Sequence, residues 1–451
     1  MKKLLTAALT TVVGTAFAAS AMATETRVNS LSAAGGLGGA FNEKTITLRD
    51  TDHSRLDSNA IDVFPQWMVW HKNSVDVDNT VGTSYGSMNV RYALSDDPAP
   101  PVLMLFGKRS PWAPVTNVGG ILPGGKGNTP TKLAGGPGFG ANPISGQTLA
   151  DATNHQFGIG FGMKAGESVR LGATLSIGGN RADTQGQNPT SAAQTDDEQS
   201  NTWVNFNFGL GFDINEVNSL DFGLNIMGGS FTNMNGNSPF YASNGLFGFA
   251  FTARGEFMVS QISRIVPYLR VNYDSRSVIG QVWNNDSART NLIGTVNNTW
   301  IILGSDLAIM PPNMEGVLIQ PGIGLIAHLA TAAGNSDEGA SSSTREDASN
   351  IMPWYGFSAE AKAFEWLFLR LGARQVISRV HSSNTATAQG QNNETFYSSV
   401  TNTVSTGLGI KLMGWDLDIN MNPAFFNNGI MAVSGNPTPG WGVDWALGYD
   451  W

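Results

Sequence analysis

Large apolar residues recur at every second position along most of this chain. The stretch from Val204 to Ile214 is typical, because bulky apolar side chains there alternate with Asn, Gly and Asp. A period of two places one set of side chains on each face of a β-strand. Similar alternation occurs at residues 220–226, 247–256, 265–274, 367–372 and 407–412, whereas few segments keep a helical period. The pattern predicts an all-β fold whose strands each have one apolar face.

The connections between these segments alternate in length. Short connections occur near residues 96–100, 164–167, 215–216, 260–263, 311–314, 364–365 and 413–414. Between them fall long polar stretches: Arg109 to Asn154, Gly179 to Ser200, Asn233 to Ser243, Gly280 to Thr290, Ala333 to Asn350 and His381 to Asn393. Tight turns at one end and larger loops at the other are typical of transmembrane β-barrels. We therefore expect a transmembrane antiparallel β-barrel.

The expected barrel has about sixteen strands, from Asp62–His71 at the start to Trp441–Trp451 at the end. A count of about fourteen is the alternative, because Pro65 and Pro101 lie in or beside the weak first strands. An even number of strands leaves both termini on the periplasmic side. The uncharged run from Gly316 to Ala333 is long enough for a marginal membrane helix, but its alternation, Pro and Gly residues favour a strand.

The N-terminus carries the features of a secretory signal peptide. Lys2 and Lys3 precede an uncharged, mostly apolar run, and the small-residue site Ala21-Met22-Ala23 follows it. We expect cleavage before Thr24, which makes residues 1–23 the signal peptide. Residues 24–61 are then an N-terminal periplasmic segment or a plug in the lumen, and residues 62–451 form the barrel.

Composition excludes several classes of protein. Charged residues make up 14% of the chain and the formal net charge is −9. With a pI of about 5.0, this balance does not suit a nucleic-acid binder. No Cys is present, which excludes disulfides, thiol catalysis and Cys-ligated metals. The five His residues form no close pair at ligand spacing, and no catalytic or nucleotide-binding motif occurs in its required context. We predict no enzyme, no cofactor and no metal site.

The chain ends on an aromatic residue within an alternating segment. One face of this segment carries large apolar residues: Trp441, Val443, Trp445, Leu447, Tyr449 and Trp451. The segment resembles the terminal strand by which Gram-negative outer-membrane proteins are recognised for assembly, with Trp451 and Tyr449 as the assembly signal. The whole chain resembles an outer-membrane porin-like barrel in architecture, without a subfamily motif. The resemblance implies the bacterial outer membrane as location, with its lipid, lipopolysaccharide and barrel-assembly machinery as partners, and a possible homo-oligomer.

The function implied by this resemblance is a channel for passive or facilitated diffusion of small hydrophilic solutes. A plugged structural or adhesive surface barrel is one alternative. A transporter of hydrophobic substrates is another, because the Gly-rich, polar segment from Thr24 to Ala60 resembles the N-terminal hatch of the long-chain fatty-acid transporters. The Gly- and Pro-rich connection over residues 109–154 either folds into the pore or stays outside it.

Alternation also assigns charged residues to the barrel interior, because a Lys or Arg facing lipid would cost about 2–4 kcal/mol near the midplane. The candidate pore-lining residues are Arg254, Glu256, Arg270, Asp274, Lys362, Arg370, Arg374, Lys411, Asp416 and Asp418. The same face is expected to hold Arg170, Asp213, Asp221, Arg276, Asp306 and Glu360. Two interpretations are open. These groups either select solutes by charge, or brace the wall as cross-strand ion pairs.

Overall fold

The computed structural model describes residues 61–421 and 443–450, apart from positions 62, 81–84, 98, 111–153, 188–193, 216, 236–237, 285–287, 315, 337–342, 387–390 and 414. The predicted signal peptide over residues 1–23, the segment over residues 24–60 and most of the connection over residues 109–154 lie outside the described residues. The interpretations placed on these three segments therefore stay predictions.

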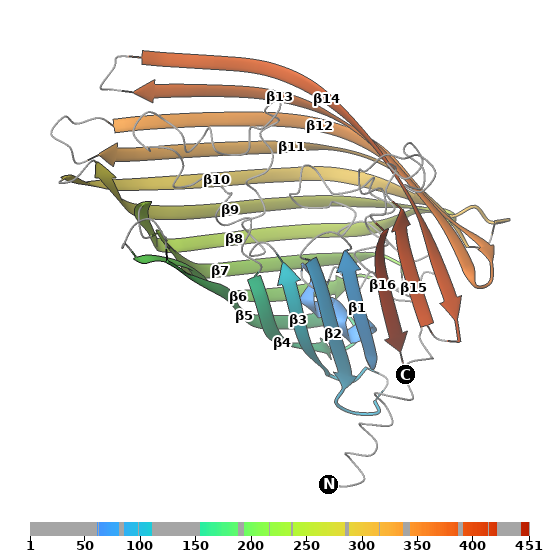
Figure 1. Cartoon of the computed structure of the whole chain (residues 1–451). Helices are drawn as coiled ribbons and strands as arrows, with labels where there is room; N and C mark the ends of the chain where they lie inside the picture. Colours follow the sequence, from blue (N-terminus) through green and yellow to red (C-terminus); the bar gives the residue numbers. More distant parts are fainter. Residues whose placement is uncertain are drawn as a thin grey trace, which may run out of the picture.

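Sixteen strands in the described residues form one closed antiparallel barrel (Figure 1). Each strand pairs with its neighbours in sequence, and β1 closes the barrel on β16, where Ser74 lies opposite Asp450. The all-β fold and the count of sixteen are confirmed. The strands are β1 (Ser74–Thr80), β2 (Tyr85–Ala93), β3 (Val102–Ser110), β4 (Asn154–Ala165), β5 (Val169–Gln187), β6 (Gln194–Asp213), β7 (Ser219–Asn235), β8 (Ser238–Ser260), β9 (Ser263–Asn284), β10 (Ala288–Ile309), β11 (Val317–Ser336), β12 (Ser343–Phe364), β13 (Leu367–Ala386), β14 (Gln391–Leu412), β15 (Trp415–Met421) and β16 (Val443–Asp450).

The two faces of the wall differ as the alternation predicts. On β6, Phe206 and Phe208 are exposed on one face, whereas Asn205 and Asn207 are buried on the other. The exposed face carries large apolar side chains on most strands, so it is the outer, lipid-facing surface of the barrel. The strand interpretation of the run from Gly316 to Ala333 is also correct, because most of this run lies in β11.

The wall is much taller on one side than on the other. The ten strands β5–β14 have 17 to 23 residues, whereas β1–β4, β15 and β16 have 7 to 12 (Figure 1). Residues 391–405 of β14 consequently pair with β13 alone, because β15 reaches only as far as Thr406. Residues 180–187 of β5 likewise pair with β6 but not with β4. The closed barrel therefore continues at one end as an open, curved sheet.

Five of the six long polar stretches predicted as loops are largely strand. Those over residues 179–200, 233–243, 280–290, 333–350 and 381–393 belong mainly to paired hairpins, as where Asp183 lies opposite Glu198. Apolar alternation is needed only where one face meets lipid. Beyond that level both faces of a hairpin can be polar while the backbone still pairs, so the alternation does not mark these residues as strand.

The prediction of a first strand at Asp62–His71 is wrong. Residues Pro65–Trp70 form a 3₁₀ helix, η2, and the barrel begins only at Ser74. Pro65 suits the first turn of a helix because its missing N–H would be unpaired there. With three residues per turn, Phe64, Trp67 and Trp70 fall on one side, where successive rings lie 4.8 and 6.0 Å apart. Among the described residues, no helix is long and apolar enough to cross a membrane.

Candidate functional site: the barrel interior

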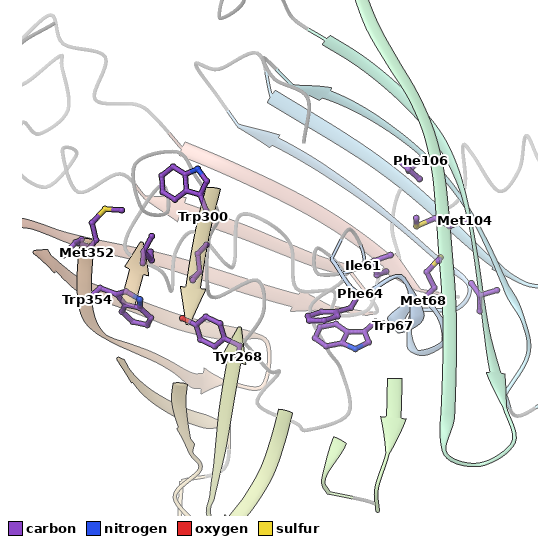
Figure 2. Close-up of a cluster of buried hydrophobic side chains, with 14 residues drawn as sticks. Ile61, Phe64, Trp67, Met68, Met104, Phe106, Tyr268, Trp300, Met352 and Trp354 are labelled. Atoms are coloured by element: carbon purple, nitrogen blue, oxygen red, sulfur yellow. The ribbon is translucent and has the colours of Figure 1, made fainter. Parts of the chain in front are cut away.

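The helix η2 packs against the inner face of the barrel, mainly on β4, β5 and β6. Phe64, Trp67 and Met68 are completely buried. Figure 2 shows them beside Met104 and Phe106 of β3, with a second group on β9–β12 formed by Tyr268, Trp300, Met352 and Trp354. These side chains belong to one apolar cluster, completed by Ile61, Val102, Ile302, Ile326 and Val376. The interior therefore contains a packed apolar core in addition to its polar groups.

Glycines on the wall make room for this helix. A Cβ at Gly172 would collide with the backbone of Pro65 and Gln66, and a Cβ at Gly223 would collide with the carbonyl oxygen of Val63. A Cβ at Gly209 would meet the Gln66 side chain. The three glycines lie side by side on β5, β6 and β7. We call them the glycine cradle. Because they bring backbone against backbone, a larger residue at Gly172 or Gly223 cannot be accommodated by a side-chain rotation.

Asp221, next to the cradle on β7, anchors η2 to the wall. Its Oδ1 accepts a hydrogen bond from Trp67 Nε1 at 2.9 Å and one from Gln66 Nε2 at 3.1 Å. The same carboxylate lies 3.3 Å from the guanidinium of Arg170 and 3.4 Å from that of Arg254. Asp221 is fully buried. A buried charge is tolerated only when it is paired and hydrogen-bonded, which all four contacts provide.

The anchor is the centre of a longer chain of charges that follows the inner wall. Alternating acidic and basic groups on β5–β9 form this chain in the following order: Asp213, Arg170, Asp221, Arg254, Glu256 and Arg264. Arg170 also lies over the ring of Trp70, 3.9 Å from its centroid, and Arg254 lies 5.1 Å from that of Trp67. Both guanidinium groups thus bind a carboxylate and an aromatic ring of the helix. The charges hold η2 in place on several sides.

A second ion-pair network lies on β12–β15. Arg370 Nε is 2.7 Å from Glu360 Oε2, and its other branch pairs with Asp418 of β15. Gly409 lies between them on β14, and a Cβ there would collide with the guanidinium of Arg370. The missing side chain lets Arg370 reach across a whole strand. Glu360, Arg370 and Asp418 therefore form the cross-strand network that one of the two interpretations of these charges predicts.

The remaining candidate pore-lining residues have other contacts on the wall. Arg270 donates to Asn272 and Thr252, Asp274 accepts from Asn298, and Lys411 lies over the ring of Phe368. Arg374 and Asp416 are buried, while Lys362 packs beside Gly316. The ten residues lie on β8, β9 and β12–β15, and Lys411 is directly opposite Asp416 on neighbouring strands. The side chain of Arg276 lies outside the described residues.

The proposed assembly signal is described only in part. Tyr449 stacks on Trp415 of the neighbouring strand with ring centroids 5.5 Å apart, while Trp451 lies outside the described residues. Stacked aromatic rings near strand ends are typical of the interfacial girdles of membrane barrels. The assembly role of both residues stays a prediction.

The alternation did not identify η2 and its cradle as the central feature of the interior. The signal available in the sequence was the spacing of three by which Phe64, Trp67 and Trp70 recur around Pro65, which fits a short helix better than a strand. The apolar inner residues Trp300, Met352 and Trp354 were also unexpected, because polar or small residues were predicted there. Among the described residues, no three His, Asp or Glu side chains come close enough together to hold a metal ion.

A closed antiparallel barrel with an apolar outer face and a polar, charged inner face defines a class of protein. Such a barrel leaves no unpaired strand edge where it is closed, so it can span a lipid bilayer. The described part of the chain has the fold of a transmembrane β-barrel of the outer-membrane type.

Comparison with known proteins gives only general similarities. No protein-family model and no curated protein sequence matches the chain. Among solved structures, the ferric yersiniabactin uptake receptor FyuA from Yersinia pestis has a TM-score of 0.42 at 7% identity, over 77% of this chain and 68% of that one. The alcaligin outer membrane receptor FauA from Bordetella pertussis has a TM-score of 0.35 at 8% identity, over 84% and 75%. The properties of this chain therefore have to follow from its own residues.

Proposed function

We propose that this protein transports small hydrophilic solutes across the outer membrane by facilitated diffusion, and that η2 obstructs the path through the barrel. The observation that carries this proposal is the seat of η2, which is fixed inside the barrel by Asp221 and the glycine cradle. Charged residues on the inner wall, including the ten candidate pore-lining residues, support a polar path beside it.

Free diffusion through a wide, permanently open pore suits the interior less well. Many side chains on the inner face are buried, as Arg170, Asp274 and Glu360 show. A wide water-filled channel would leave such groups exposed. The passage of a solute should therefore require a displacement of η2 from its seat.

Single-channel recording in planar bilayers tests this function with a matched pair of glycine variants. Gly172→Ala places a Cβ against the backbone of η2, so it should dislodge the helix and raise the conductance severalfold. Gly107→Ala is the control, because the nearest atom to a Cβ there is 3.9 Å away, and its conductance should equal that of the wild type. Channels that are absent in all three proteins would contradict transport of hydrophilic solutes. Equal conductance in all three would contradict the obstruction by η2.

A transporter of hydrophobic substrates is the second candidate. The observation in its favour is the apolar part of the inner face, where Trp300, Ile302 and Met352 lie together. Uptake of a fluorescent long-chain fatty acid by cells that produce the protein separates the two candidates. The hydrophilic function predicts no uptake above the background of cells without the protein.

A further inference from the structure

A patch of uncharged polar side chains lies next to η2 on the inner face of β4–β7. Its members carry amide or hydroxyl groups, and we call them the amide patch: Gln156, Thr174, Ser176, Asn205, Asn207 and Asn225. Thr174, Asn207 and Asn225 form one row across three strands. Each lies two residues beyond a glycine of the cradle, on the side away from the short turns. The patch therefore begins where the seat of η2 ends.

Hydrogen bonds inside the patch fix the orientation of its groups. The amide of Asn225 donates to Asn205 Oδ1 at 2.7 Å and also to Asn207. Asn207 Nδ2 donates to Thr174 Oγ1 at 2.8 Å, and Gln156 Nε2 donates to Ser176 Oγ at 2.7 Å. The carboxamides are thus held as an ordered surface of donors and acceptors before any ligand arrives, which reduces the entropy lost on binding.

An aromatic ring borders the patch. Trp203 lies two residues before Asn205 on the same face of β6, and its ring lies over the backbone of Gly178 on β5. The Trp203 side chain is itself buried, with 3% of its surface exposed. Trp203 Nε1 and Asn225 Oδ1 are buried and find no hydrogen-bond partner among the described residues. A buried donor and a buried acceptor without partners need an explanation, and a ligand hydroxyl can satisfy either of them.

The six side chains of the amide patch are uncharged, and Lys108 of β3 is opposite Gln156 at its edge. On β4–β7, the described side chains of these inner rows include no Asp, Glu, Lys or Arg. The charges of the η2 anchor lie on the other side of the glycine cradle, toward the short turns. An ion that left water for this surface would lose hydration without gaining a countercharge, whereas a neutral solute would not. Hydroxyl groups match the amides, and they can also pair with Trp203 Nε1 and Asn225 Oδ1.

We propose that the amide patch is a binding site for a neutral polyhydroxylated solute such as an oligosaccharide, one hydroxyl group of which accepts a hydrogen bond from Trp203 Nε1. The inference rests on the proposed transport function and names its substrate class. Asn225 is only partly buried, whereas Asn205 and Asn207 are almost completely so, and it is therefore the side from which a solute reaches the patch. A solute bound there lies directly against η2, where it can take part in displacing the helix.

Titration calorimetry of the purified barrel in detergent tests the site independently of conduction. The probe is raffinose, an uncharged trisaccharide, with sodium glutamate as the charged comparison. Wild-type protein should bind raffinose and not glutamate. Asn225→Ala removes the donor shared by Asn205 and Asn207 and should weaken binding roughly tenfold, the range of one to two neutral hydrogen bonds.

Two further variants separate loss of the site from loss of the fold. Thr174→Val keeps the shape of a β-branched residue but removes the acceptor of Asn207, so it should also weaken binding. Asn350→Ala is the matched control, because Asn350 is a fully buried amide on the inner face of β12, far from the patch in sequence. It should bind raffinose like the wild type.

The outcomes distinguish the two proposals. Absence of raffinose binding in a protein that conducts, or equal weakening by Asn350→Ala, overturns the amide patch and leaves transport intact. Binding of raffinose that the patch variants weaken, in a protein that forms no channels, supports the site and overturns transport.

Discussion

At the scale of single residues, the interior is organised by Asp221. This one carboxylate contacts two residues of η2 and two arginines of the wall, so the helix and the charge network depend on the same group. Its neighbour Asp213 also pairs with Arg170, at 2.7 Å, but its side chain is 27% exposed. The two aspartates therefore offer a comparison between a buried and a partly solvated partner of the same arginine.

Asp221→Ala should lower the free energy of unfolding by about 3–5 kcal/mol, because it leaves buried guanidinium groups and the η2 donors without their shared acceptor. Asp213→Ala should lower it by less than about 1 kcal/mol, since water can replace a partly exposed partner. Urea unfolding of the refolded barrels, followed by heat-modifiable migration on gels, measures both. Similar losses in the two variants would show that Asp221 is not the anchor.

Arg370 and Arg374 test the alternative roles of the inner charges. Arg370 is held between Glu360 and Asp418, so Arg370→Ser combined with Arg374→Ser should destabilise the barrel. If these charges also line the solute path, the two unpaired carboxylates should shift the reversal potential in a salt gradient toward cation selectivity. Arg264→Ser is a control on another part of the wall, where Glu256 keeps Arg254 as a partner. A reversal potential unchanged in the double variant would leave these arginines as braces only.

The sequence predicted well which side chains of the strands point into the barrel. Because successive residues of a strand point to opposite faces, alternation alone placed Arg254, Asp274 and Arg370 inside. The partners of these residues depend on the register between strands, which the alternation does not contain. Arg370 can reach across β14 only because residue 409 is a glycine. The role of this glycine becomes visible only when the register of β13, β14 and β15 is known.

At the scale of elements, the sequence predicts strands best where lipid enforces a period of two. It fails at residues 62–71, where apolar residues occur without strict alternation and form η2. It also fails in the hairpins that extend the tall wall, where both faces can be polar. The number of strands agrees with the prediction, although the first predicted strand is η2 and the barrel begins instead with β1 at Ser74.

The hairpin extensions should be dispensable for the barrel. Residues 184–197 at the tip of the β5–β6 hairpin can be replaced with an Asn-Gly turn. This change removes only residue pairs between β5 and β6, in a part of β5 that does not pair with β4. The variant should therefore fold and keep its heat-modifiable migration. Deleting the eight residues 171–178 should abolish folding, because these residues of β5 pair with both β4 and β6. Failure of the first variant to fold would show that the extension is needed to form the barrel.

At the scale of the whole molecule, the two ends of the barrel differ in what they carry. At the end where β1 begins and β16 ends, the connections between strands have two to eight residues (Figure 1). The Asp221 anchor of η2 lies close to the β6–β7 turn at this end. The tall wall extends from the opposite end. In outer-membrane barrels short turns face the periplasm. In that orientation, a solute from outside passes the tall wall, then the amide patch, and finally η2.

This orientation can be tested in living cells with one small epitope tag at two positions. A tag inserted after residue 341, between β11 and β12, should bind its antibody on intact cells, because this connection lies at the tall end. A tag after Asn215, in the short β6–β7 turn, should bind only after the outer membrane is permeabilised. Permeabilised cells also show that both tagged proteins are present. Labelling of the Asn215 tag on intact cells would show that the barrel has the opposite orientation. An incoming solute would then meet η2 before the amide patch. A solute bound at the patch could not be what displaces the helix.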